Sequence, residues 1–279
     1  MKRVYLLPNM ITAFGLACGL FVIFKVNMIE PGRGYYEIMT SSAWLLLLAA
    51  FADFIDGAVA RVFHAESEFG FMFDSLADAI SFGVAPSVLL LKGLSLEQGT
   101  ALSFIIAMGA MIYSLCGVLR LVRFNVSKHK NEGNLIEITV QKKNFTGLPI
   151  PAAAAASVSA NLIFLSPFFG SLSQMNNTLK VIILTIIMIT LGYLMVSRWK
   201  FPSLKALHFR VPSFYLAIGT VFIAICILYG VLYYFPIILA VVSWCYIFIA
   251  LILSVIRVIA GKKSKTLEDF EPDSEDKFN

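Results

Sequence analysis

Charged residues are scarce in this chain. Only 14% of its 279 residues are Asp, Glu, Lys or Arg, while 59% are hydrophobic. The mean hydropathy is +0.83. A soluble globular domain carries about 25% charged residues, so this composition argues against a soluble protein. It predicts an integral membrane protein.

Histidine and cysteine are also rare. The three histidines all stand in predicted connections between apolar runs: His64, His129 and His208. A histidine metal site is therefore not expected. The four cysteines stand in apolar runs without paired spacing: Cys18, Cys116, Cys226 and Cys245. This pattern is typical of small buried hydrophobic residues rather than of disulfides or zinc ligands.

Long apolar runs are abundant instead. A run of about 20 apolar residues crosses a bilayer as a helix, and about eight such runs follow one another here. We expect spans at about 8–26, 41–63, 69–91, 100–124, 148–168, 178–196, 212–232 and 236–260. The predicted fold class is an all-α polytopic membrane protein, and no tandem repeat stands out.

Four aspartates interrupt the second and third predicted spans. They are Asp53, Asp56, Asp74 and Asp78. A carboxylate at membrane depth costs about 2.5 kcal/mol or more unless it faces a cavity, a partner or a metal ion. Four of them in one short region call for a shared explanation.

Their spacing places them on two helix faces. One face carries Asp53, Asp56, Gly57, Ala60 and Arg61. The other carries Gly70, Asp74 and Asp78, with Ala77 and Ser81 beside them. A short polar connection makes the two helices antiparallel, so the four carboxylates should meet at one end of a cavity. Mg²⁺ and Mn²⁺ prefer such clustered oxygen ligands, small residues leave room for a ligand, and Arg61 suits a phosphate.

The complete pattern is D-x-x-D-G-x-x-A-R-x(8)-G-x(3)-D-x(3)-D, which begins at Asp53 and ends at Asp78. It resembles the signature of the CDP-alcohol phosphatidyltransferases, with every defined position filled. The resemblance implies a six-helix core, two Mg²⁺ or Mn²⁺ ions held by the four aspartates, and Asp78 as general base. It also implies a homodimer. The alternative interpretation of the four aspartates is a buried carboxylate network that only holds helices together.

The same resemblance suggests where CDP binds. It implies contacts at Gly57, Ala60, Arg61 and Gly70. Asn9 and Thr12, near the start of the first span, either cap that helix or touch the nucleotide.

Four further stretches resemble the phosphatidylserine synthase branch of the family: L-P-N-M-I-T at 7–12, S-F-G-V-A-P-S at 81–87, R-L-V-R-F-N at 120–125 and F-T-G-L-P-I-P-A-A-A at 145–154. The resemblance covers about residues 7–205. It implies that CDP-diacylglycerol and L-serine are converted to phosphatidylserine and CMP. An arginine fork suits the serine carboxylate, so Arg120 and Arg123 are candidates. Either arginine also fits a simple anchor on the positively charged side of the membrane.

Three alternatives remain open at this point. In the first, the acceptor alcohol is glycerol 3-phosphate or an inositol compound rather than serine. In the second, the donor carries archaeal ether-linked chains. The sequence contains no feature that indicates which kind of lipid chain the protein recognises. From another class, the protein is a divalent-cation transporter, although such proteins often contain internal repeats and this chain has no second aspartate cluster.

Basic residues predict the orientation. With the first residues in the cytoplasm, the opposite side of the membrane keeps only Lys25, Arg33, Lys92 and Lys180. We therefore expect both termini and the aspartates at the cytoplasmic face of the inner (cytoplasmic) membrane. Topology and anionic lipid head groups account for the basic excess, so no nucleic-acid partner is expected. We expect a catalytic membrane domain at 1–205, a two-helix extension at 206–264 and an acidic disordered tail at 265–279.

Overall fold

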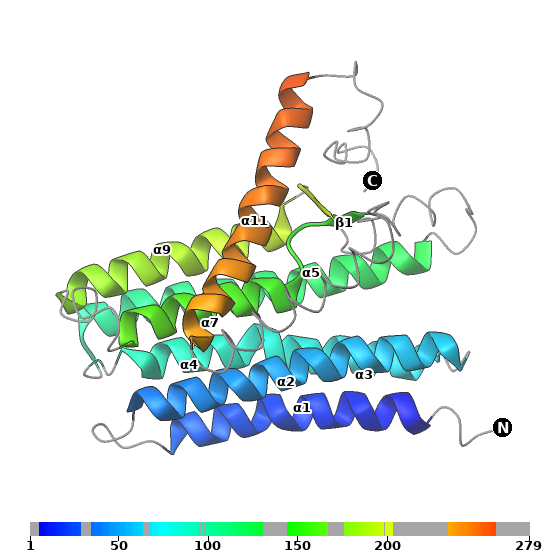
Figure 1. Ribbon diagram of the computed structural model, residues 1–279, viewed down its shortest axis with the longest axis horizontal. Coiled ribbons are helices and arrows are strands. Elements are labelled where there is room, and N and C mark those ends of the chain that lie inside the picture. Colours follow the sequence, from blue (N-terminus) through cyan, green and yellow to red (C-terminus); the bar gives the residue numbers. More distant parts are fainter. Residues whose placement is uncertain are drawn as a thin grey trace, which may run out of the picture. The chain divides into compact units, whose positions relative to one another are not determined.

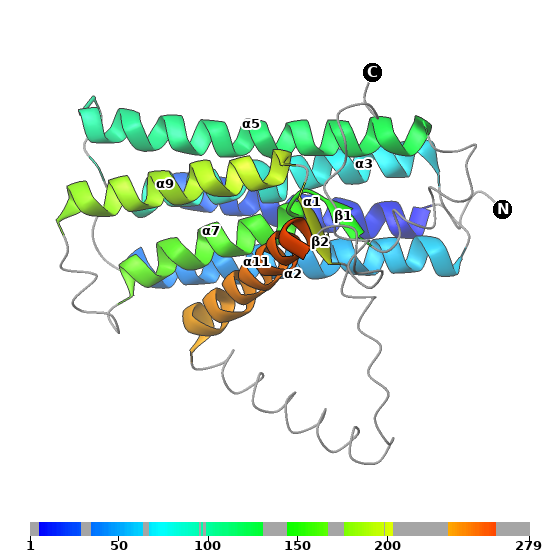
Figure 2. The same cartoon turned by 90° about the horizontal axis from the view of Figure 1, so that it is seen from above.

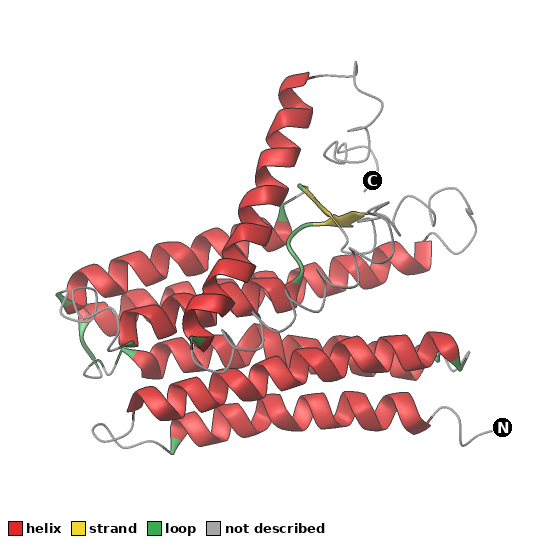
Figure 3. Ribbon diagram, in the orientation of Figure 1, coloured by secondary structure: helices red, strands yellow, loops and turns green. Residues whose placement is uncertain are grey.

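The computed structural model describes residues 6–28, 35–63, 67–94, 96, 99–130, 144–166, 176–197, 199–202 and 234–260. Its helices are α1 (Leu6–Asn27), α2 (Tyr35–Val62), α3 (Glu68–Asp78), the π-helix η1 (Ala79–Val84), α4 (Ala85–Gly93), α5 (Ala101–Lys130), α7 (Ile150–Leu165), α9 (Asn177–Val196) and α11 (Phe235–Ala260). Figure 1 labels most of them along the chain, and Figure 3 shows how strongly helices dominate. The all-α expectation is confirmed.

Six helices of the described residues are long and apolar enough to cross a membrane, which marks an integral membrane protein. They correspond to the first, second, third, fourth, sixth and eighth predicted spans. The fifth corresponds to α7, which has 16 residues and is shorter than expected. The seventh, at 212–232, lies outside the described residues, so the count of eight stays a prediction.

Two short strands were not predicted. Strand β1 (Asn144–Thr146) pairs antiparallel with β2 (Lys200–Pro202), and Phe145 lies opposite Phe201. Three residues per strand carry too little alternation to be noticed in a sequence this apolar.

The described residues fall into two compact units. The first combines residues 1–124 with 150–196, and the second combines 125–149 with 197–279. The helices of the first unit run roughly along one common direction (Figures 1 and 2). The four aspartates all belong to this first unit.

Small residues bring the helices of the first unit together. Helix α1 lies along α2 and also contacts α3, η1 and α4. A Cβ atom added at Gly15 would lie 3.4 Å from the Cβ of Ala52, and one at Gly19 would lie 2.8 Å from the Cα of Ser81. Membrane helices approach closely through such residues because lipid supplies no hydrophobic driving force between them. Phe14, Phe21 and Phe24 remain exposed on the outer face of α1, where lipid would cover them.

The third predicted span is a composite helix. Ser67 caps its start, because the Ser67 hydroxyl accepts a hydrogen bond of 3.0 Å from the Gly70 amide. The α-helical pattern changes to the π-helix η1 directly after Asp78 and resumes at Ala85, and Pro86 stands in the first turn of α4. The break therefore falls at the last aspartate of the motif.

Candidate active site

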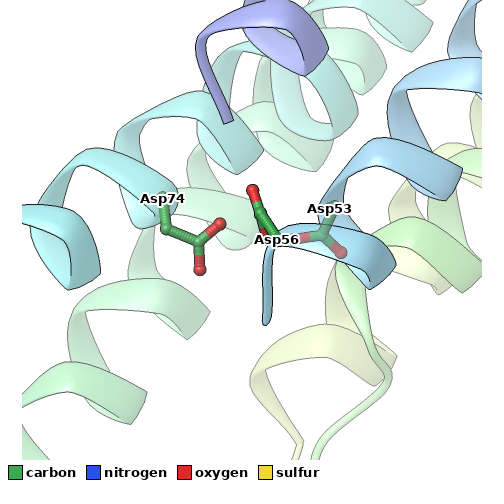
Figure 4. A group of neighbouring side chains, drawn as sticks. All are labelled: Asp53, Asp56 and Asp74. Carbon is green, nitrogen blue, oxygen red and sulfur yellow. The ribbon is translucent and has the colours of Figure 1, made fainter. Parts of the chain in front are cut away.

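Helices α2 and α3 bring three carboxylates together. Asp53 and Asp56 lie on α2 and Asp74 on α3, and one oxygen from each lies within 4.8 Å of the others. Figure 4 shows the three side chains gathered between the two helices. Asp56 is buried, with 4% of its surface exposed, while Asp53 and Asp74 are half-buried. The predicted convergence of the two helix faces is confirmed for these residues.

Asp78 lies one turn further along α3 and lines the same pocket. Asp53 is within hydrogen-bonding reach of both Asp74 and Asp78. Ionised carboxylates this close repel one another, and a bound cation or a shared proton would relieve that repulsion. The aspartates therefore form one cluster, although only three present oxygens within the tight group.

This donor set fits a hard divalent cation. Every ligand is a carboxylate oxygen, and His and Cys are absent from the described group. Such oxygen ligands suit Mg²⁺ or Mn²⁺. The group formed by Asp53, Asp56 and Asp74 can thus hold a divalent metal ion.

Thr12 reaches the cluster from α1. Its Oγ1 atom donates a hydrogen bond of 2.6 Å to Oδ2 of Asp56 and lies 3.1 Å from the carbonyl oxygen of Pro8. The sequence had offered helix capping or nucleotide contact for Thr12. The structure adds a third role, because this bond orients one carboxylate of the cluster.

The candidate CDP residues lie on α1, α2 and α3, the helices that carry or contact the cluster, and Thr12 lines the pocket itself. Nothing lies within 4 Å of a Cβ atom added at Gly57, so space is open beside Asp56. A Cβ atom added at Gly70 would lie 2.9 Å from Oδ1 of Asn9, so the two residues face each other closely. Ala60 is half-buried and Arg61 is exposed near the end of α2. Their contacts with CDP stay predictions.

The two candidate serine-binding arginines, both on α5, have different surroundings. Arg120 is buried, with 9% of its surface exposed, and acts electrostatically on Asp53 and Asp78. Arg123 donates hydrogen bonds of 2.6 and 3.4 Å to the carbonyls of Val196 and Met195. Those carbonyls belong to the end of α9, where helices lack backbone donors. Arg120 is therefore buried close enough to Asp53 and Asp78 to act on their charge, while Arg123 joins α5 to α9.

Some pocket residues were not identified from the sequence. Gly15 and Leu16 of α1, Ala49 of α2 and Phe82 of η1 line the pocket together with the aspartates. A signal existed for α1, because Gly15 and Leu16 follow Thr12 at the three-and-four spacing of one helix face. Ala77 and Ser81, noted beside the second face, also line the pocket.

Comparison with known proteins agrees with this geometry. The family model described as CDP-alcohol phosphatidyltransferase matches residues 5–191. The chain belongs to the CDP-alcohol phosphatidyltransferase family. The match to this family includes all four aspartates, and it ends before α11.

Three relatives illustrate the similarity. A protein of Helicobacter pylori named CDP-diacylglycerol–serine O-phosphatidyltransferase is 33% identical over 77% of this chain and 79% of its own length. One of Bacillus subtilis with the same name is 35% identical over 71% of this chain and 91% of its own. The archaetidylserine synthase of Methanothermobacter thermautotrophicus is 34% identical over 65% of this chain and 70% of its own. Along most of its length, the chain is therefore similar to relatives whose names specify serine transfer or archaetidylserine synthesis.

Proposed function

We propose that this chain is a CDP-diacylglycerol–serine O-phosphatidyltransferase. It transfers the phosphatidyl group of CDP-diacylglycerol to the hydroxyl of L-serine and releases CMP. The observation that carries the proposal is the aspartate pocket, with the complete family signature, in a chain whose relatives bear that name. The indicated reaction is displacement at the β-phosphorus of the pyrophosphate.

Asp78 acts as the general base. It removes the proton from the serine hydroxyl while the serine oxygen forms a bond to the β-phosphorus. The bond from that phosphorus to the bridging oxygen breaks, and the bridging oxygen leaves with CMP. The position of Asp78 at the pocket wall, beside Asp53, supports this role.

The remaining aspartates serve as metal ligands, and Asp78 shares in the set. Four carboxylates around one pocket offer enough anionic oxygens to hold two divalent ions, Mg²⁺ or Mn²⁺. Such ions neutralise pyrophosphate charge and stabilise the entering and leaving oxygens when bound. Thr12 holds Asp56 in its ligand orientation through the 2.6 Å hydrogen bond.

Substrate contacts follow from the same arrangement. CDP lies along Gly57, Ala60, Arg61 and Gly70, with Asn9 and Thr12 at the α1 side, and the open space at Gly57 supports this placement. The guanidinium of Arg120 binds the serine carboxylate, which its burial near Asp53 and Asp78 supports. Arg123 is the weaker candidate because the carbonyls of α9 already accept its hydrogen bonds.

The cellular setting is part of the proposal. The basic residues favour a pocket at the cytoplasmic face of the inner membrane with both termini in the cytoplasm. There, serine and CMP exchange with the cytosol while the acyl chains remain in the bilayer. The homodimer, the domain division at 205 and the acidic tail stay predictions.

A second candidate is the same transfer from an ether-lipid donor. The Methanothermobacter relative is named for archaetidylserine, whereas the bacterial relatives are named for diacylglycerol. Serine recurs in these names while the lipid differs. Assays with ester-linked and ether-linked CDP-lipids of equal chain length would separate the two donors.

The direct test is CMP release by the purified protein in detergent. CDP-diacylglycerol is supplied with L-serine, glycerol 3-phosphate or myo-inositol, and the lipid product is identified by mass spectrometry. We expect CMP and phosphatidylserine when serine is supplied, and no CMP release with glycerol 3-phosphate or myo-inositol. Release with glycerol 3-phosphate and none with serine would overturn the serine assignment and keep the family chemistry. No release with any acceptor, together with uptake of divalent cations into proteoliposomes, would favour the transporter.

A further inference from the structure

The π-helix η1 lies directly beside the candidate active site. It begins directly after Asp78, and two of its residues, Ser81 and Phe82, line the aspartate pocket. A π-turn inserts one extra residue per turn, which changes the phase of the following helix by about 100°. The geometry of η1 therefore sets which way Asp78 faces relative to the residues of α4.

The sequence explains why the α-helix does not continue through this segment. In an α-helix the carbonyl of Phe82 would accept a hydrogen bond from the amide of residue 86. That residue is Pro86, which has no amide hydrogen. The carbonyl of Phe82 therefore lacks the donor that an α-helix would supply, and Phe82 is buried, with 2% of its surface exposed.

Helix α5 supplies that donor. The hydroxyl of Tyr113 donates a hydrogen bond of 3.0 Å to the carbonyl of Phe82. Tyr113 is completely buried, with 0% of its surface exposed. The Ser157 hydroxyl of α7 lies within hydrogen-bonding reach of the same phenol group.

Neighbouring contacts hold η1 from both sides. The Ser114 hydroxyl donates to the carbonyl of Gly83 at 2.9 Å on the α5 side. On the α1 side, the Ser81 hydroxyl donates to the carbonyl of Gly15 at 3.4 Å. Gly19 leaves the space that Ser81 fills, since an added Cβ atom would lie 2.8 Å from the Cα of Ser81. The Tyr113 bond reaches the carbonyl whose α-helical donor is absent because residue 86 is proline.

We propose that Tyr113 is a positioning residue for phosphatidyl transfer: its hydroxyl completes the π-turn at Phe82 and thereby holds Asp78 toward the acceptor. The inference rests on the proposed function of Asp78. Tyr113 is not among the residues that line the pocket, so its effect passes through the backbone of η1. It governs the rate of the chemical step and leaves donor binding to the pocket residues.

The test compares Tyr113→Phe with Tyr193→Phe. Both changes remove one phenol hydroxyl, but Tyr193 lies on α9 with 63% of its surface exposed. We expect Tyr113→Phe to lower kcat by about 10- to 100-fold, the effect of a small displacement of a catalytic group. The KM for CDP-diacylglycerol should change by less than about twofold, and Tyr193→Phe should match the wild-type protein. A wild-type kcat in Tyr113→Phe, or equal losses in kcat and donor affinity, would overturn the inference.

A second variant tests the missing donor itself. Pro86→Ala restores an amide hydrogen four residues after Phe82, so the backbone no longer depends on the tyrosine. In the Pro86→Ala background, the further loss on Tyr113→Phe should shrink to about twofold or less, a coupling that a double-mutant cycle measures. The double variant also serves if Tyr113→Phe alone is too unstable to assay. An undiminished loss in that background would contradict the proposal.

Hydrogen–deuterium exchange supplies a readout that needs no turnover. Amides in peptides covering 79–90 should exchange about tenfold faster in Tyr113→Phe, the equivalent of one lost hydrogen bond. Amides of α9 should be unchanged. Unchanged exchange at 79–90 would overturn the inference. A wild-type protein that releases CMP with no acceptor would overturn the proposed function alone, because the exchange result stands apart from it.

Discussion

Two buried threonines of the first unit show how the region around α1, α2 and α3 differs from the region around α7 and α9. Thr12 on α1 and Thr185 on α9 are 6% and 7% exposed, and each hydroxyl lies near the carbonyl four residues earlier in its own helix. Thr185 is satisfied there, at 2.7 Å from the carbonyl of Val181. Thr12 additionally donates to the carboxylate of Asp56 on another helix.

The polar groups around the two threonines differ in the same way. On α7, the Ser159 hydroxyl donates to the carbonyl of Ala156 on its own helix, and Thr185 packs its methyl group against Gly109. In the α1–α2–α3 region, carboxylates from different helices converge on one point. Burial of polar groups alone therefore does not mark a site in a membrane protein. Convergence of charge from several helices does, because its cost needs a ligand or an ion in return.

The largest expected effect is loss of the cations. EDTA should reduce CMP release to background, and Mg²⁺ or Mn²⁺ should restore it, because four neighbouring carboxylates cannot all remain ionised without a counter-charge. Asp53→Asn should weaken both activity and Mn²⁺ binding, measured by electron paramagnetic resonance. Full turnover in a thoroughly chelated sample would remove the metal assignment.

Next in size is Asp78→Asn. A general base typically contributes about 100- to 10,000-fold to the rate, so kcat should fall by that factor while binding of CDP-diacylglycerol is largely retained. Single-turnover CMP release and equilibrium binding of the CDP-lipid separate the two effects. Near-normal turnover in this variant would show that another group accepts the proton.

The two arginines of α5 should differ from each other. Arg120→Ala should raise the KM for serine by about 10- to 150-fold, since a lost charged partner costs about 1.5–3 kcal/mol. Arg123→Ala should mainly lower stability, by about 1 kcal/mol, because it removes donors from the end of α9. Serine titrations and thermal unfolding in detergent measure these effects. Equal effects of the two variants on the serine KM would contradict the distinction.

The smallest effect is expected for the paired threonines. Thr12→Val and Thr185→Val each remove one hydroxyl and keep the side-chain shape. Loss of a partner that orients a metal ligand costs about tenfold in metal affinity, so Thr12→Val should raise the Mn²⁺ concentration needed for half-maximal activity by that factor. Thr185→Val should leave it unchanged. A matched response of both variants would mean that the Thr12–Asp56 bond has no special role.

Much of the architecture could be predicted from residue order. Length and apolar composition predicted the six long helices of the described residues, because crossing a bilayer demands about 20 apolar residues with internally satisfied backbones. The boundary of the fifth span was less accurate: it was predicted at about 148–168, whereas α7 runs from Ile150 to Leu165. The strand β1, which precedes that span, was not predicted. The predicted seventh span falls on residues that the structure does not describe.

The candidate site divides in the same manner. The three-and-four spacing of Asp53, Asp56, Asp74 and Asp78 determined that each pair shares a helix face, since helical periodicity is a local property. That two faces meet within 4.8 Å depends on how α1 packs against both α2 and α3. Sequence spacing carries no information about that distance.

The sequence by itself thus determined the membrane class, the helix faces and the ligand chemistry of the carboxylates, because each follows from composition or from contacts within one helix. Tertiary structure decided the surroundings of the two arginines: Arg120 is buried near the charge of Asp53 and Asp78, whereas Arg123 bonds to the end of α9. It likewise decided that Thr12 serves Asp56 and that Tyr113 serves Phe82. These bonds join residues 44 and 31 positions apart, and only the packing of separate helices brings such residues within hydrogen-bonding distance.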